Sequence, residues 1–581
     1  MPHPVPGLPN PKLERTSLGE ALLVVLSPAL AYWLMNFQPV MQNGFLDPYI
    51  YTAFIHNFSD LFQRYGTTYY GVRFGTIVPG QIGTALFGPI AGYFAVRWVM
   101  ALIAGVPFYL LARQRYGRVT AIVVFALLMT SPFLARTLLW DHPDSTGVPF
   151  LFAAICLYSI EHPKRRLVDA IAGTFAGLAV HSNVFTLAPL GMFYGVHAAL
   201  WLAYRRTPRE LVRRLMTIAI AIVAVSAAGS ALYWLRIGRA DIFTITVNMS
   251  LSLTAGQMEN WRIAGFDWVA RQWWIFAPVA LVLFVPMVWV RTRIDFHDAV
   301  LWTSATVVTL FYYVYQFLLN GTFLQLFYYF SYLLPFIFLL LMLVASALLD
   351  LVDRPTQWRV MLVLLAAAIG PWVLWSFEQS VLLPASLVQY LGIVLLTTVL
   401  VIAAVRTSFR SPGMTFAAAT ALGLTVAGSF AGPDQTTSVY RTAVNSRVSP
   451  SSLQMDVYRV ALDFMKAVPP LAERPGEILF WYSNRPPRNP MQSIQSTYLW
   501  GYSKLQGDGP GLPALEPREL KTILEPRVKW LGLLAEREEQ LAEARAKLVQ
   551  NDVAFDSVGR KAISHGTYTL YVEFLGLRKS E

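Results

Sequence analysis

The amino-acid sequence predicts an α-helical polytopic membrane protein with about thirteen transmembrane helices, followed by a C-terminal extracytoplasmic α/β domain. Three observations predict this class. The chain of 581 residues is 55% hydrophobic and only 14% charged, and its mean hydropathy is +0.47, which is too apolar for a soluble globular protein. Its apolar runs are long enough to cross a bilayer, and its Lys and Arg residues cluster between these runs.

The N-terminal residues 1–18 are polar and rich in proline, so they are predicted to form a cytoplasmic tail. They lack the charged and then apolar start of a secretory signal. The first span, about residues 21–37, is therefore expected to remain as an uncleaved anchor. The single cysteine, Cys156, lies in an apolar run, which excludes a disulfide framework, a thiolate zinc site and an iron–sulfur cluster formed by this chain alone.

The predicted transmembrane domain covers residues 19–432, and its spans are expected to alternate with loops of opposite charge character. The net charge is +12, but Lys and Arg residues form short clusters between the apolar segments, which is typical of cytoplasmic loops and does not indicate nucleic-acid binding. One charge, Arg97, is unexpected because it lies beside the centre of a predicted span. The span centres are near Leu26, Val96, Ala126, Phe152, Gly177, Tyr194, Val223, Leu281, Val308, Phe338, Leu365, Val394 and Leu422.

Residues 433–581 have the composition of a soluble protein, and the odd number of spans places them on the outer side of the membrane. Short runs of aromatic and branched residues predict strands at 477–483, 527–534 and 567–575. Helical spacing of apolar residues predicts helices at 455–467 and 536–550. Together these elements predict a small α/β domain.

The first outer loop, residues 38–83, contains the motif GFLDPYIYTA, in which Asp47 is the single acid. Polar residues close to the hydrocarbon are costly and tend to be functional. Two interpretations of Asp47 stay open, a catalytic base and a helix cap with Pro48 in the first turn, and the two are compatible. The other candidates in this loop are His56, Asp60, Arg64, Tyr69, Tyr70 and Arg73.

The next outer loop carries a second acidic cluster, LLWDHPDSTGVPF, at residues 138–150. Asp141, His142 and Asp144 could bind a metal, orient an acceptor hydroxyl or hold a base in place. For Asp144 the alternative is a cap at the start of the fourth span. A cap does not require Asp141 or His142.

Further candidates lie at the outer ends of later spans. His181 is either a packing residue or a ligand near the same cavity, and Asn183 follows it. Outer-loop arginines suit either a phosphate or lipid headgroups, and Tyr328 and Tyr329 could equally belong to an interfacial aromatic belt. The arginines concerned are Arg236, Arg239, Arg262 and Arg271. The chain has no GxxxxGK[ST], HExxH or CxxC motif, so nucleotide hydrolysis and zinc proteolysis have no support.

These features resemble the C-type glycosyltransferase (GT-C) superfamily, integral-membrane enzymes that use polyprenyl-phosphate sugars and include protein mannosyltransferases and aminoarabinose transferases. The similarity rests on GFLDPYIYTA, its continuation RYGTTYYGVRFGTIVPG, the acidic WDHPD and the outer C-terminal domain. It implies that Asp47 deprotonates the acceptor while an arginine neutralises the leaving phosphate. Arg73 or Arg262 could provide this positive charge. Many relatives carry a paired acid where this chain has Pro48, so no cofactor is expected, and a divalent metal at Asp47 and Asp141 is the less favoured alternative.

The sequence therefore predicts a glycosyltransferase that moves a hexose or pentose from a polyprenyl-phosphate donor to a lipid, glycan or protein acceptor, at the periplasmic face of a bacterial inner membrane. The expected partners are these substrates and membrane lipids, without nucleic acid. The alternatives are a glycan polymerase or ligase of another membrane fold, or a transporter of lipid or solute. The residues expected to bind substrate or phosphate are Arg64, Tyr70, Arg73, Asp141, His142, Asp144, His181, Arg262, Tyr328 and Tyr329.

Overall fold

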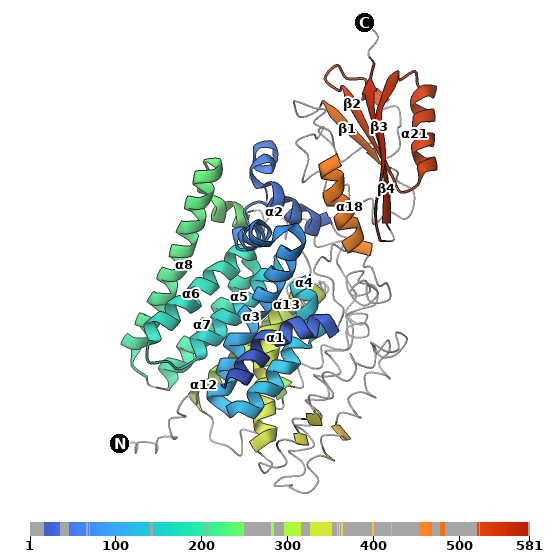
Figure 1. The fold of residues 1–581 in the computed structure, drawn as a ribbon. Coiled ribbons are helices and arrows are strands. Elements are labelled where there is room, and N and C mark those ends of the chain that lie inside the picture. Colours follow the sequence, from blue (N-terminus) through green and yellow to red (C-terminus); the bar gives the residue numbers. More distant parts are fainter. Residues whose placement is uncertain are drawn as a thin grey trace, which may run out of the picture.

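The structure consists of a helical membrane part and a C-terminal domain with a β-sheet (Figure 1). It is a computed structural model. In addition to the ranges given in the next sentence, it describes residue 68 and a few scattered residues between 357 and 420. The described ranges are 17–34, 46–65, 70–139, 143–204, 206–248, 281–283, 295–314, 326–350, 453–467, 477–482, 520–521, 523–566 and 568–578.

Among the described residues, three helical segments are long and apolar enough to cross a membrane: Phe74–Met129, Val184–Ala203 and Pro208–Ile237. Shorter apolar helices cover Leu18–Ala31 and Ser331–Ala347. The helical membrane class is thus confirmed, whereas the count of thirteen spans stays a prediction. The helices of this part are α1 (Leu18–Leu34), α2 (Leu46–Tyr65), α3 (Phe74–Met129), α4 (Pro132–Leu139), α5 (Asp144–Ser159), α6 (Arg165–Ser182), η1 (Val184–Thr186), α7 (Leu187–Ala203), α8 (Pro208–Ile237), α12 (Phe296–Val314) and α13 (Leu326–Asp350).

Helix α3 is interrupted twice, at Gly88 (φ +80°) and Gly117 (φ +85°), where the backbone takes a conformation that favours glycine. The segments before and after Gly88 fold against each other. A Cβ placed on Gly92 would lie 2.5 Å from the carbonyl oxygen of Gly83, so the two backbones are in direct contact. The second and third predicted spans are the segments that follow these two breaks.

Helix α5 forms the centre of the membrane part, because nearly all of its side chains are buried. It packs between α3 and α6 (Figure 1). The rings of Phe108, Phe152 and Phe338 meet at centroid distances of 6.2 to 6.5 Å and join α3, α5 and α13. Outward-facing α8 instead exposes apolar residues such as Ile220 and Val223, as expected for a surface in contact with lipid.

Buried ion pairs hold together the helix ends that carry the predicted cytoplasmic bases. Glu20 of α1 contacts Arg113 (3.0 Å) near the Gly117 break. Asp169 of α6 contacts both Arg165 (3.2 Å) and Arg214 of α8 (3.1 Å). These bases therefore form structural ion pairs, and they are also candidates for setting the orientation of the chain in the membrane.

The C-terminal domain contains a four-stranded sheet in the order β1-β2-β4-β3. Strands β1 (Ile478–Tyr482) and β2 (Trp530–Ala535) are parallel, and β4 (Tyr568–Leu577) runs antiparallel to both β2 and β3 (Phe555–His565). Helix α21 (Glu538–Gln550) packs on the sheet. The three strands and two helices that the sequence predicted here are confirmed, while the domain boundaries stay predictions.

Candidate active site

Three helix ends meet beside a cluster of buried polar side chains: the starts of α3 and α5 and the end of α6. Arg73 Nη1 donates to the carbonyl oxygen of Ser182 at 3.0 Å. The hydroxyls of Thr76 and Thr146 are 2.9 Å apart, and Thr146 donates to Ser182 Oγ at 3.1 Å. A Cβ on Gly75 would lie only 2.4 Å from Ser182 Oγ. This glycine therefore permits the close approach of α3 to α6.

Asp144, at the start of α5, is buried next to these residues and is 2% exposed. Its Oδ1 accepts a hydrogen bond from Asn183 Nδ2 at 2.9 Å and another from the Tyr332 hydroxyl of α13. Helix α5 begins after Pro143 without a capping hydrogen bond from a side chain. The Asp144 carboxylate accepts donors from Asn183, which follows α6, and from α13, and its capping role stays a prediction. Such charge-assisted hydrogen bonds offset the cost of burying the carboxylate.

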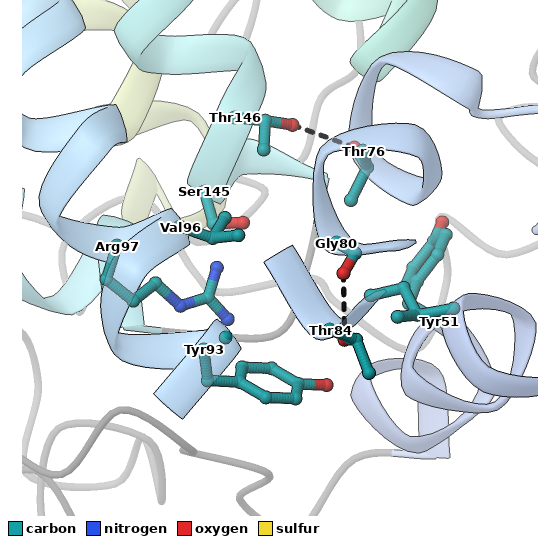
Figure 2. A pocket seen from close by; sticks show the side chains of 11 residues that line it. Tyr51, Thr76, Gly80, Thr84, Tyr93, Val96, Arg97, Ser145 and Thr146 are labelled. Carbon is teal, nitrogen blue, oxygen red and sulfur yellow. Dashed lines mark hydrogen bonds between the residues drawn. The ribbon is translucent and has the colours of Figure 1, made fainter. Parts of the chain in front are cut away.

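A small cavity that opens outward adjoins the cluster (Figure 2). Arg97 of α3 lies in its wall, is 5% exposed and has its guanidinium 5.5 Å from the centroid of the Tyr93 ring. Among the described residues that line the cavity, Arg97 carries a charge and six others carry hydroxyl groups. The lining residues are Tyr51, Ile55, Thr76, Gly80, Thr84, Gly92, Tyr93, Val96, Arg97, Ser145 and Thr146.

Helix α2 forms one wall of the cavity and contains Asp47 in its first turn. Asp47, Tyr51 and Ile55 follow one another at intervals of four, so these positions share one face of the helix. Tyr51 and Ile55 line the cavity. The side chain of Asp47 lies outside the described residues, and its role as base or cap stays a prediction.

Two further predicted residues lie close to this site. The Tyr70 ring packs edge-on against Tyr51 with a centroid distance of 5.3 Å. His181 Nε2 is 2.8 Å from Ser226 Oγ, and its ring centroid is 4.4 Å from that of Phe74. These contacts are those of a hydrogen-bonded packing residue, the alternative that the sequence left open for His181.

The other predicted site residues are placed less fully. Arg64 lies in α2, and Tyr328 and Tyr329 lie in the first turn of α13, but their side chains are outside the described part of the chain. Asp141, His142 and Arg262 are outside it altogether. The described residues contain no group of three His, Cys, Asp or Glu side chains that could hold a metal ion. The binding roles assigned to all these residues stay predictions.

Sequence reasoning missed four residues that the structure brings to the site: Thr76, Tyr93, Arg97 and Tyr332. Arg97 gave a usable signal, because an arginine within a transmembrane segment is a functional candidate by default. Tyr332 belongs to the run QLFYYFSYLLPF, of which only Tyr328 and Tyr329 were selected. Nothing in the sequence distinguishes Thr76 and Tyr93 from other polar residues at helix surfaces.

No model of a protein family matches the chain, and none of the curated proteins matches it. Among solved structures, ArnT from Cupriavidus metallidurans in the apo state superposes with a TM-score of 0.51 at 14% identity, covering 96% of this chain and 98% of that chain. ArnT from the same organism bound to undecaprenyl phosphate gives 0.50 at 15% identity with the same coverage. An oligosaccharyltransferase from Archaeoglobus fulgidus scores 0.39 at 15% identity, over 91% of this chain and 69% of that chain, which is too distant to support an inference. The chain therefore shares the overall fold of ArnT.

Proposed function

We propose that this protein is a glycosyltransferase that moves a sugar from a polyprenyl-phosphate donor to a lipid, glycan or protein acceptor. The observation that carries the proposal is the cavity lined by Arg97 and several hydroxyl groups, one wall of which is the helix that contains Asp47. The fold supports it, because it is shared with ArnT, which has been solved with undecaprenyl phosphate bound. We place the site on the periplasmic face and the enzyme in a bacterial inner membrane.

In the proposed reaction, an acceptor hydroxyl attacks the anomeric carbon of the donor sugar. The bond between that carbon and the phosphate oxygen breaks, and its electron pair leaves with the polyprenyl phosphate. Asp47 takes the proton of the acceptor hydroxyl as the new glycosidic bond forms. A general base at hydrogen-bonding distance contributes roughly 10²- to 10⁴-fold to the rate. No metal is required for these steps.

The cavity supports Arg97 as the residue that faces the negative charge of the phosphate. Arg73, assigned to this role from the sequence, is buried and holds the cavity wall through its hydrogen bond to the Ser182 carbonyl. At a separation of 4 Å and an effective dielectric constant of about 20, a unit cation and anion attract each other by about 4 kcal/mol. A cation in a fixed position stabilises the charge on the leaving group without reorganisation of solvent.

The test is turnover of a panel of polyprenyl-phosphate sugars by the purified protein, with Asp47→Asn beside the wild type. We expect the wild type to consume at least one donor and Asp47→Asn to lose at least 100-fold in kcat. Asp241→Asn is the matched control, because Asp241 is an exposed acid that contacts only Arg239 among the described pairs. Equal turnover by wild type and Asp47→Asn would refute the assignment of the base.

Accessibility provides a second test that does not depend on identifying the donor. A thiol introduced as Asp47→Cys should react with a membrane-impermeant reagent added from the periplasmic side. The native Cys156 is buried and serves as the internal negative control. Labelling of position 47 from the cytoplasmic side alone would contradict the proposed orientation and the mechanism with it.

A further inference from the structure

Helix α18 (Leu453–Ala467) attaches to the sheet of the C-terminal domain through one of its faces. Its acids Asp456 and Asp463, seven residues apart, meet the turn between β3 and β4. Asp463 Oδ2 is 2.5 Å from His565 Nε2. A Cβ on Gly566, which has a φ of +52°, would lie 2.2 Å from Asp456 Oδ2, so the carboxylate is seated directly against the turn.

The other face of α18 contacts the membrane part through Met455 and Tyr458, which form a buried apolar cluster with Tyr93 of α3. Tyr458 is 1% exposed. Its hydroxyl donates to the carbonyl oxygen of Pro89 at 3.1 Å and lies 3.0 Å from His56 Nε2 of α2. Tyr458 of the C-terminal domain therefore joins α2 to Pro89, the residue after the Gly88 break in α3.

The directions of these two hydrogen bonds follow from the number of protons available. The Pro89 carbonyl can only accept, and the single hydroxyl proton of Tyr458 is directed at it. His56 must then carry a proton on Nε2 and donate it to the hydroxyl oxygen. Burial lowers the pKa of His56 to about 4, so at neutral pH the imidazole is uncharged and has this one ring proton.

This contact adjoins the cavity. Tyr93 lines the cavity, packs edge-on against the Tyr458 ring at 5.6 Å and donates its hydroxyl to Thr52 Oγ1 of α2 at 3.0 Å. The Arg97 guanidinium lies over the same Tyr93 ring. Tyr458 thus touches both helices at the point where they enclose the candidate active site.

We propose that Tyr458 is a positioning residue: by bonding His56 and Pro89 it fixes α2, and with it Asp47, relative to the cavity wall formed by α3. The catalytic part of this inference rests on the proposed function. Its physical basis is that displacement of a reacting group by about 1 Å can cost on the order of 100-fold in rate. Tyr458 itself touches no reacting atom.

The experiment compares Tyr458→Phe with wild type in the full-length protein, because phenylalanine keeps the ring packing and removes only the hydroxyl. We expect kcat to fall by about tenfold with KM changed by less than about twofold, since a misplaced base weakens the transition state more than substrate binding. Amide hydrogen exchange should become faster in α2, residues 46–65. Tyr568→Phe is the matched control, because Tyr568 is also a buried tyrosine of the same domain and its hydroxyl bonds Glu536.

A second pair of variants tests the hydrogen bond from the side of α2. His56→Gln retains an N–H donor and should keep kcat within about threefold of wild type, whereas His56→Leu should match the loss in Tyr458→Phe. Wild-type kcat together with unchanged α2 exchange in Tyr458→Phe would overturn the inference. If the wild-type protein turns over no polyprenyl-phosphate sugar, the proposed function fails, and α2 exchange alone decides whether Tyr458 positions this helix.

Discussion

Replacing Arg97 by methionine should abolish most of the affinity for an anionic polyprenyl headgroup. Methionine retains much of the apolar volume of the side chain and removes the positive charge from the cavity wall. The attraction of about 4 kcal/mol expected at 4 Å is an upper limit, because desolvation of the anion opposes it. A net loss of about 2–4 kcal/mol corresponds to an increase in Kd of about 30- to 700-fold.

The assay is titration of the purified wild-type and variant proteins with undecaprenyl phosphate, followed by native mass spectrometry. The Kd of Arg97→Lys should lie between those of the wild type and Arg97→Met, because lysine keeps the charge but cannot offer two parallel N–H donors. Arg239→Met is the control, since Arg239 is exposed and paired with Asp241 at 3.3 Å. Folding is verified for each variant by its elution volume and thermal unfolding.

Equal Kd values for wild type and Arg97→Met would refute the assignment of this cavity to the phosphate. If Arg239→Met raised Kd as much as Arg97→Met, the effect would come from the overall charge of the protein and not from the cavity.

Three other predictions concern stability. Arg214→Met leaves Asp169 buried with only Arg165 as a charged partner and should cost about 3 kcal/mol, measured by thermal unfolding in detergent. Burial raises the pKa of Glu536 to about 7 from 4.5, so the folded state binds this proton more tightly than the unfolded state. The stabilisation from the protonated carboxyl, on the order of 1 kcal/mol after allowing for partial exposure, is lost as pH rises through 7. Hydrogen exchange of β2 should become faster over this pH range, and Glu536→Gln should remove the pH dependence. Gly75→Ala should cost about 1–3 kcal/mol by overpacking, measured by thermal unfolding, whereas Gly191→Ala, with open space around it, should not.

The sequence predicts well the elements whose signals are local. The strands at β1, β2 and β4 contain runs of aromatic and branched residues, and they were predicted to within a few positions. Strand β3 was missed because FDSVGRKAISH is polar and glycine-containing. It forms an edge of the sheet with most side chains exposed, so burial imposes no apolar alternation on it.

The sequence predicted a site residue only where its type alone was unusual for its surroundings. Asp144 was selected as an acid in an apolar chain, but its partners Asn183 and Tyr332 are 39 and 188 residues away in sequence. Such pairings depend on how α5, α6 and α13 pack, which no local pattern encodes. Arg97 was noticed as an anomaly, but its place in a cavity became clear only from the fold of α3 at Gly88.

The contact between Gly83 and Gly92 determines how the cavity can open. Backbone atoms meet there without an intervening side chain, so no change of rotamer can separate the two α3 segments. The wall contributed by α5 is held by the buried side-chain hydrogen bonds of Asp144. At Gly80, by contrast, the neighbour is the flexible end of the Ile55 side chain of α2. A substrate larger than the cavity is therefore expected to enter by displacing α2, whose contact with Gly80 is made by a flexible side chain.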